Sequence, residues 1–132
     1  MPGNEVSQRK LIKRISLILM IAFYIVAGIN HFRNPTAYYR IIPDYLPNPH
    51  LINIVSGIAE VTLAVLLLFT VTRKIAAYGI ILMLLLFIPA HIEMIKNGWC
   101  FNPGYCLPAW ATWIRLFPLQ FLLMWWAWSN RK

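Results

Sequence analysis

Charged residues are scarce in this chain of 132 residues, and acidic residues are scarcer still. Charged residues make up 12% of the sequence, and only four of them are Asp or Glu, against twelve Lys or Arg. Hydrophobic residues make up 60%, a share above that of ordinary water-soluble domains. The composition therefore excludes a soluble globular domain and predicts a single membrane domain over residues 1–132.

The basic residues could point to a nucleic-acid partner, because the formal net charge is +8. They stand in short runs at the ends of apolar stretches, however, and do not line a solvated face as nucleic-acid contacts do. We therefore expect membrane lipid around the chain and no bound nucleic acid.

Four apolar stretches are long enough to cross a bilayer. A hydrocarbon core about 30 Å thick needs about 20 residues of helix, because each residue adds about 1.5 Å. The stretches lie near residues 11–32, 49–70, 74–95 and 108–128. The first follows basic residues as a secretory signal does, but it is long and lacks a small-residue cleavage site, so we expect a retained helix. The predicted fold class is all-α, an integral membrane four-helix bundle.

The Lys and Arg residues beside the predicted helices indicate the orientation, because short basic segments stay on the cytoplasmic side of a membrane. The basic residues at one end are Arg9, Lys10, Lys13, Arg14, Arg73, Lys74, Arg131 and Lys132. Those at the other end are Arg33, Arg40 and Lys96. We expect both termini in the cytoplasm and, in a bacterium, a multi-pass protein of the inner membrane.

Prolines predict where the helices begin, end and bend. Pro35 disfavours helix in the residue before it, so the first helix should end at Asn34. Asn48 followed by Pro49 has the pattern of an N-cap before a proline at the first helical position. Pro118 should kink the last helix or leave a carbonyl free. A short connection at residues 71–73 predicts that the second and third helices form an antiparallel hairpin.

Tryptophans gather toward the ends of the last two stretches, as interfacial anchors do. They are Trp99, Trp110, Trp113, Trp125, Trp126 and Trp128. We expect them to lie at the membrane interfaces.

Several polar residues fall inside the predicted spans, where an ionised side chain costs about 2.5–3.5 kcal/mol at the bilayer centre. In the second span, Asn53, Gly57 and Glu60 recur at spacings of three and four and so share one face. In the first span, Tyr24 and His31 flank a stripe of small residues, which lets a neighbouring helix come close. Both faces should point into the bundle.

His91 and Arg115 complete the candidate site. His91 and Glu93 lie two residues apart, so their side chains diverge, and we expect His91 to point inward. By helical rise, Glu60 lies near the midplane, and Arg115, His91 and His31 lie progressively nearer the outer surface. We expect Glu60 and Arg115 to form an ion pair, because neither can stay charged alone in hydrocarbon.

These polar residues permit two interpretations. A buried ion pair can serve only to fix how the helices pack, and a histidine at the boundary can simply bond a carbonyl. Polar groups that converge on an outward-facing cavity favour instead a ligand-binding or proton-relay site. The residues of this predicted site are Tyr24, His31, Asn53, Glu60, His91 and Arg115. Haem between His31 and His91 is a weaker alternative, because the two lie at different depths, and we expect no metal site.

Cys100 and Cys106 are the only cysteines, and they fall on the side predicted to lie outside the cytoplasm, where disulfides persist. The spacer contains Asn102, Pro103 and Gly104, which favour a turn, so the two sulfurs can meet. We expect a structural disulfide. A redox-active pair is left open, although the C-x-x-C spacing of thiol oxidoreductases is lacking.

Several short motifs between residues 25 and 95 resemble the DoxX-like family of small membrane proteins. They are G-I-N-H-F at 28–32, the proline-rich loop at 43–49, S-G-I-A-E at 56–60, T-R at 72–73 and P-A-H-I at 89–92. The resemblance implies a four-helix membrane fold and, for some relatives, an association with quinone-linked sulfur oxidation or with terminal oxidases. The cysteine loop and Arg115 lie outside the part that carries the resemblance.

Three functions stay open. The first is a membrane redox subunit that binds a quinone headgroup, with His31 and His91 bonding its carbonyls and Glu60 relaying protons. The second is a non-catalytic accessory or assembly subunit, docked onto a larger membrane complex. A homo-oligomer is left open separately as a partner. The third is a carrier of a small molecule or lipid. The residues leave open whether the chain is an enzyme.

Overall fold

The structure, a computed structural model, describes residues 2–102 and 104–132. Its elements in chain order are α1 (Pro2–Arg33), α2 (Pro35–Tyr39), α3 (Pro49–Leu67), α4 (Thr70–Leu86), α5 (Ile88–Asn97), β1 (Cys100–Asn102), β2 (Tyr105–Cys106), α6 (Ala109–Ile114), the π-helix η1 (Arg115–Leu119) and α7 (Gln120–Ser129). Three helical stretches are long and apolar enough to cross a membrane: Pro2–Arg33, Pro49–Leu67 and Thr70–Asn97. The stretch predicted at 108–128 is present as the consecutive pieces α6, η1 and α7.

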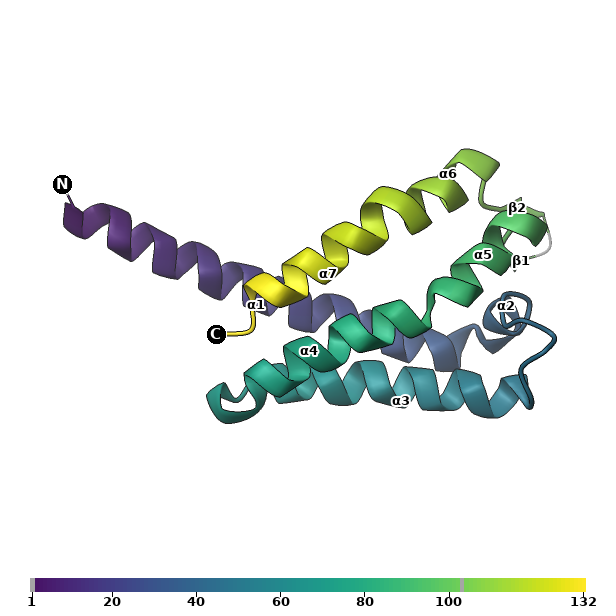
Figure 1. The fold of residues 1–132 in the computed structure, drawn as a ribbon, viewed down its shortest axis with the longest axis horizontal. Helices are drawn as coiled ribbons and strands as arrows, with labels where there is room; N and C mark the ends of the chain where they lie inside the picture. Colours follow the sequence, from purple (N-terminus) through teal and green to yellow (C-terminus); the bar gives the residue numbers. More distant parts are fainter. Residues whose placement is uncertain (1, 103) are drawn as a thin grey trace.

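Helix α1 is longer than predicted. It begins at Pro2 instead of residue 11, and its first part projects beyond the other helices (Figure 1). The residues from 2 to 15 are all exposed there. The helix ends at Arg33, and α2 begins directly at Pro35, where a proline without an N–H is tolerated.

Helix α3 has the predicted N-cap. The side-chain oxygen of Asn48 accepts a hydrogen bond from the backbone N–H of Leu51 at 3.2 Å, and Pro49 takes the first helical position. Asn48 has a φ of 49°, in the left-handed region that asparagine tolerates better than most residues. The N-cap prediction is therefore confirmed.

The turn between α3 and α4 comes earlier than predicted, at residues 68–69 instead of 71–73. The side chains of Thr72 and Arg73 explain the difference. They donate hydrogen bonds of 2.7 and 2.9 Å to carbonyls in the last turn of α3, where helical carbonyls lack partners of their own. These two residues lie in the first turn of α4 and cap the end of α3.

The third predicted span, at residues 74–95, is not one continuous α-helix, because Phe87 separates α4 from α5. Pro89 lies in the first turn of α5, and it has no N–H with which to continue the hydrogen-bond ladder of α4. Near the break, the side-chain amide of Gln120 donates a hydrogen bond to the carbonyl of Leu84. As a result, α5 leans away from the direction of α3 (Figure 1).

Two further features lie in the last third of the chain, and the first of them departs from the all-α prediction. Strands β1 and β2 form a short antiparallel hairpin after α5, which the helical periodicities do not reveal. Pro118 lies in η1, the π-helical turn between α6 and α7. A π turn shifts the hydrogen-bond register, which accommodates the missing N–H, so the irregularity predicted at Pro118 takes this form.

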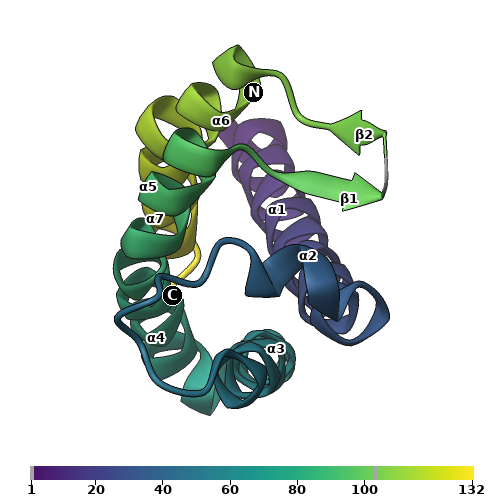
Figure 2. The same ribbon diagram turned by 90° about the vertical axis from the view of Figure 1, so that its right-hand side faces the viewer.

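The long helices pack in chain order, α1 against α3, α3 against α4, and α4 against α7 (Figure 2). The start of α1, the α3–α4 turn and the end of α7 lie at one end, the terminal end (Figure 1). Helix α2 and the hairpin lie at the other, the hairpin end. A large core around Met20, Tyr24, Leu67 and Ile80 joins the helices. A separate small core at the hairpin end consists of Ala37, Ile41, Met94 and Trp99.

Helices α1 and α3 approach closely through two glycines. A Cβ added to Gly28 would lie 2.6 Å from Val61 Cγ2, and one added to Gly57 would lie 2.9 Å from the Cβ of His31. Real carbon atoms do not approach so closely, so this contact needs glycine on both helices. The close approach predicted for the small-residue face is thereby confirmed, and it brings His31 to the polar face of α3.

Replacing Gly57 with alanine should lower thermal stability, because the added methyl overlaps His31 and the backbone of Gly28. Overpacking of this kind costs about 1–3 kcal/mol. A thermal melt in detergent micelles measures the effect. Gly3→Ala is the control, since a Cβ on Gly3 meets nothing within 4 Å. Equal melting temperatures for the two variants would show that the α1–α3 contact is not tight.

Candidate functional site

A cavity of about 120 Å³ lies toward the hairpin end, bounded by α1, α2, α3, α5 and η1. The predicted site residues in its lining are His31, Asn53, Glu60, His91 and Arg115. Tyr38 and Trp99, which the sequence analysis did not assign to a site, line it as well. The structure therefore brings five of the six predicted residues around one cavity, and only Tyr24 lies apart from it.

Asn53 fixes the hydrogen bonding of the His31 ring. Its Nδ2 donates to the backbone carbonyl of His31 at 2.9 Å, and its Oδ1 lies 2.7 Å from Nδ1 of the ring. Because the amide nitrogen must face the carbonyl, the amide oxygen faces the ring, and only a protonated Nδ1 can donate to it. His31 therefore carries a proton on Nδ1, and its other nitrogen, Nε2, is directed to Glu60.

Glu60 and His31 form a buried pair of a carboxyl group and an imidazole. His31 Nε2 lies 3.4 Å from Glu60 Oε2, and both side chains are buried. Glu60 Oε2 has no hydrogen-bond partner among the described residues, so the two groups lie beside each other without a hydrogen bond between them. An acidic and a basic side chain thus stand side by side at the wall of the cavity.

The predicted ion pair between Glu60 and Arg115 is wrong. Among the described residues, only His31 has a basic nitrogen within 4.0 Å of a carboxyl oxygen of Glu60. The guanidinium carbon of Arg115 lies 5.5 Å from the centre of the Trp99 ring, a cation–π distance. The glycine contact between α1 and α3 brings His31 to Glu60, whereas Arg115 begins the π turn of the last helical stretch.

His91 is buried, as predicted, whereas Glu93 is partly exposed and lies 4.0 Å from Lys96. Nδ1 of His91 lies 2.8 Å from the carbonyl oxygen of Phe87, so this nitrogen carries a proton. In the neutral ring, Nε2 then has a lone pair that can accept a hydrogen bond from a ligand. Because both ring nitrogens of His31 already have protein partners, the two histidines do not form a free pair of haem ligands.

Tyr24 lines a second cavity of about 40 Å³, which shares Glu60, His91 and Arg115 with the first. Three buried polar atoms have no hydrogen-bond partner within the part of the chain that the structure describes: Tyr24 Oη, Glu60 Oε2 and Arg115 Nε. Buried polar atoms are nearly always satisfied. These three atoms therefore indicate that the two neighbouring cavities take up water or a polar ligand, and the smaller one has room for water.

Tyr38 of α2 is a site residue that the sequence analysis missed. Its ring stacks on the ring of His31, with centroids 3.8 Å apart and planes inclined by 20°. Asn30 Nδ2 donates to its hydroxyl oxygen at 2.7 Å. Burial raises the pKa of Tyr38, so the hydroxyl keeps its proton and can donate it to a hydrogen bond. Tyr38 follows no periodic pattern, because α2 lies between the predicted spans.

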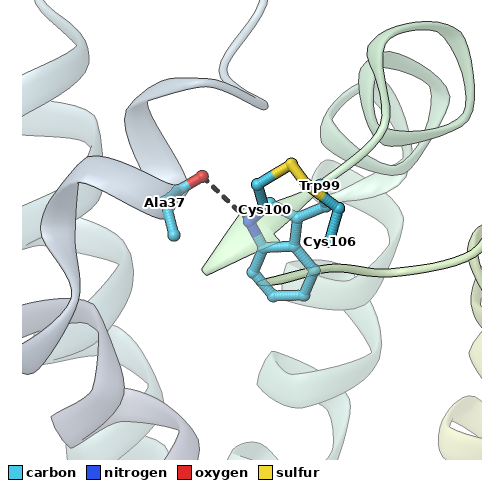
Figure 3. Close-up of a disulfide and its surroundings, with 4 residues drawn as sticks. All are labelled: Ala37, Trp99, Cys100 and Cys106. Carbon is cyan, nitrogen blue, oxygen red and sulfur yellow. Dashed lines mark hydrogen bonds between the residues drawn. A yellow bond between two sulfur atoms is a disulfide. The ribbon is translucent and has the colours of Figure 1, made fainter. Parts of the chain in front are cut away.

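Trp99 covers the cavity at the hairpin end, although the sequence predicts it as an interfacial anchor. Its side chain is 3% exposed, and its Nε1 donates to the carbonyl of Ala37 at 2.9 Å (Figure 3). The next residue, Cys100, forms a disulfide with Cys106. We call α2, Trp99 and the hairpin the roof. The turn predicted between the cysteines includes Pro103, which lies outside the described residues.

Most of the other tryptophans are exposed, as anchors should be. The exposed ones are Trp110, Trp113, Trp125 and Trp128. Trp126 is partly buried, and its Nε1 donates to the hydroxyl of Ser16 at 2.8 Å. This bond ties α7 to α1 near the terminal end.

Replacing Cys100 and Cys106 together with serine should loosen the roof. A disulfide that closes a loop of this length stabilises the folded state by about 2 kcal/mol, because it lowers the conformational entropy of the unfolded chain. Hydrogen exchange followed by mass spectrometry should show faster exchange in residues 35–41 and 98–107, with α3 unchanged as an internal control. Unchanged exchange in the roof would mean that the disulfide does not hold it.

The proton positions on the histidines can be read directly by nitrogen NMR of histidine-labelled protein. We expect protonated Nδ1 on both His31 and His91, because each faces an acceptor oxygen. Asn53→Leu should abolish this preference at His31 and leave His91 unchanged. An unprotonated Nδ1 on His31 in the unaltered protein would contradict the hydrogen bond from His31 to Asn53.

Comparison with known proteins bears on the family. No curated protein matches the chain, and no solved structure matches it. The family described as a domain of unknown function (DUF8561) matches residues 20–131. This range contains both cysteines and every residue of the predicted site. The chain therefore belongs to the DUF8561 family.

Proposed function

We propose that the chain is a DoxX-like, multi-pass membrane protein whose polar cavity binds a small molecule and exchanges a proton with it. In this arrangement α6, η1 and α7 together form a fourth span over residues 109–129, about 32 Å long by helical rise. The basic residues support an orientation with both termini in the cytoplasm, because eight lie toward the terminal end and three toward the hairpin end. The cavity then faces outward.

The ligand we propose is the headgroup of a quinone. A cavity of about 150 Å³ is known to hold benzene, so a cavity of about 120 Å³ is near the size of one ring. Aromatic side chains in its lining, Tyr38, Phe87 and Trp99, suit a flat ring. Glu60 with His31, and Arg115 across the lining, offer hydrogen bonds to ring carbonyls.

The buried pair of His31 and Glu60, whose Nε2 and Oε2 atoms lie 3.4 Å apart, carries this proposal. Reduction of a quinone to a quinol takes up two electrons and two protons. A redox protein in the same membrane would supply both electrons, Glu60 and His31 would supply one proton, and water that reaches the cavity would supply the other. The chain is then a redox-associated subunit of a larger system, with the cavity as its quinone site.

A second candidate function is that of an accessory subunit. Its support is a row of exposed aromatic side chains along α6, η1 and α7: Trp110, Trp113, Phe117, Phe121, Trp125 and Trp128. Their spacings of three and four residues place the aromatic side chains of each α-helix on one face of that helix, and the rings of Trp113 and Phe117 stack at 5.6 Å where the π turn begins. Such a face fits a membrane protein partner or a second copy of the chain as well as lipid.

The test is a calorimetric titration of the protein in lipid nanodiscs with a benzoquinone that has no tail. Glu60→Gln removes the carboxyl group and should weaken binding at least about tenfold, since a hydrogen bond to a charged group contributes about 1.5–3 kcal/mol. Glu93→Gln is the matched control, because Glu93 is partly exposed and lines neither cavity.

Equal binding by the two variants, or no binding by the unaltered protein, would contradict a quinone headgroup site. In that case, co-purification of a stoichiometric partner from native membranes would favour the accessory function instead.

A further inference from the structure

An apolar groove of about 470 Å³ lies between α3 and α4. Leu51, Val55, Ala59 and Leu63 line it on α3, and Gly79 and Leu82 line it on α4. From Leu51 to Leu63 the groove follows α3 for roughly 18 Å, by helical rise. Its size and its apolar walls suit a hydrocarbon chain.

The groove and the polar cavity share a wall. Ile52 and Ser56 on α3, and Leu86 and Phe87 at the end of α4, belong to both linings. The two spaces are therefore separated by no more than one layer of side chains. Leu86 is 68% exposed, and an exposed side chain of this kind changes rotamer within nanoseconds.

The shared wall coincides with the break in the third helical stretch. Phe87 separates α4 from α5, and beyond it α5 leans away from α3 (Figure 1). At the hairpin end, Tyr38 and Trp99 of the roof line the cavity, and Trp99 is 3% exposed. The exposed Leu86 belongs instead to the side of the cavity that faces the groove.

We propose that the ligand is an amphiphile with a tail: its flat polar head occupies the cavity, and its alkyl or isoprenoid tail lies in the groove between α3 and α4. The ligand reaches the site from the lipid, through the shared wall. This inference rests on the proposed function, which places the head in the cavity, and adds the tail and the route.

Photolabelling in lipid nanodiscs tests the tail. The probe is a benzoquinone whose alkyl tail carries a diazirine near its end, and labelled positions are mapped by mass spectrometry. We expect labels on Val55, Ala59, Leu63 and Leu82, and we expect an excess of tail-less benzoquinone to displace them. Displacement shows that head and tail belong to one bound molecule.

Ala59→Phe fills the groove and is the decisive variant. It should reduce groove labelling about tenfold, as expected for excluding about two methylene groups from their contacts, while calorimetric binding of tail-less benzoquinone stays unchanged. Ile58→Phe is the matched control, because Ile58 is exposed and lines neither the groove nor the cavity. Leu82→Phe repeats the test from the α4 wall, should Ala59→Phe fail to fold.

Three outcomes would overturn the inference. In the first, labelling is equally strong on other exposed residues such as Ile18 and Phe121. In the second, groove labelling is not reduced in Ala59→Phe or in Leu82→Phe. In the third, an excess of tail-less benzoquinone does not reduce groove labelling. The last result would indicate an ordinary lipid chain in the groove. Calorimetry with the tail-less compound measures binding of the headgroup alone. It therefore distinguishes a wrong assignment of the tail from a wrong assignment of the headgroup site.

Discussion

The contact of α1 with α3 through Gly28 and Gly57 is the constraint on which the rest of the site depends. It brings the two backbones so close that a methyl group on either glycine would overlap the other helix. At this separation His31 reaches both Asn53 and Glu60 across the interface. A larger residue at either position would separate the three side chains, although none of them would itself have changed.

The polar groups of the site belong to segments with different roles. Asn53 fixes the His31 ring, the ring lies 3.4 Å from Glu60, and Tyr38 stacks on the ring from α2. Arg115 stays apart from Glu60 and lies against Trp99. The negative and positive side chains thus occupy different parts of the lining, which leaves space between them for a polar ligand where a direct ion pair would have closed it.

The sequence predicted the features that depend on the spacing of residues within one helix. The inward face with Asn53 and Glu60, the buried His91 and the cap at Asn48 follow from helical periodicity and from proline position. The sequence did not predict the partner of Glu60, because the residue that lies beside it depends on how the helices approach one another. Tyr38 and Trp99 were missed as site residues for a related reason: they lie in connections, and only the tertiary fold brings them over the cavity.

The buried side chains form two separate cores, and this division bears on how the molecule unfolds. The small core contains Ala37 and Trp99 of the roof together with Ile41 and Met94, whereas the large core joins the long helices. Side chains that pack in separate groups can come apart in separate cooperative steps. The roof can therefore unfold locally while the helices stay packed, so its stability can be adjusted by substitution without changing that of the helical framework.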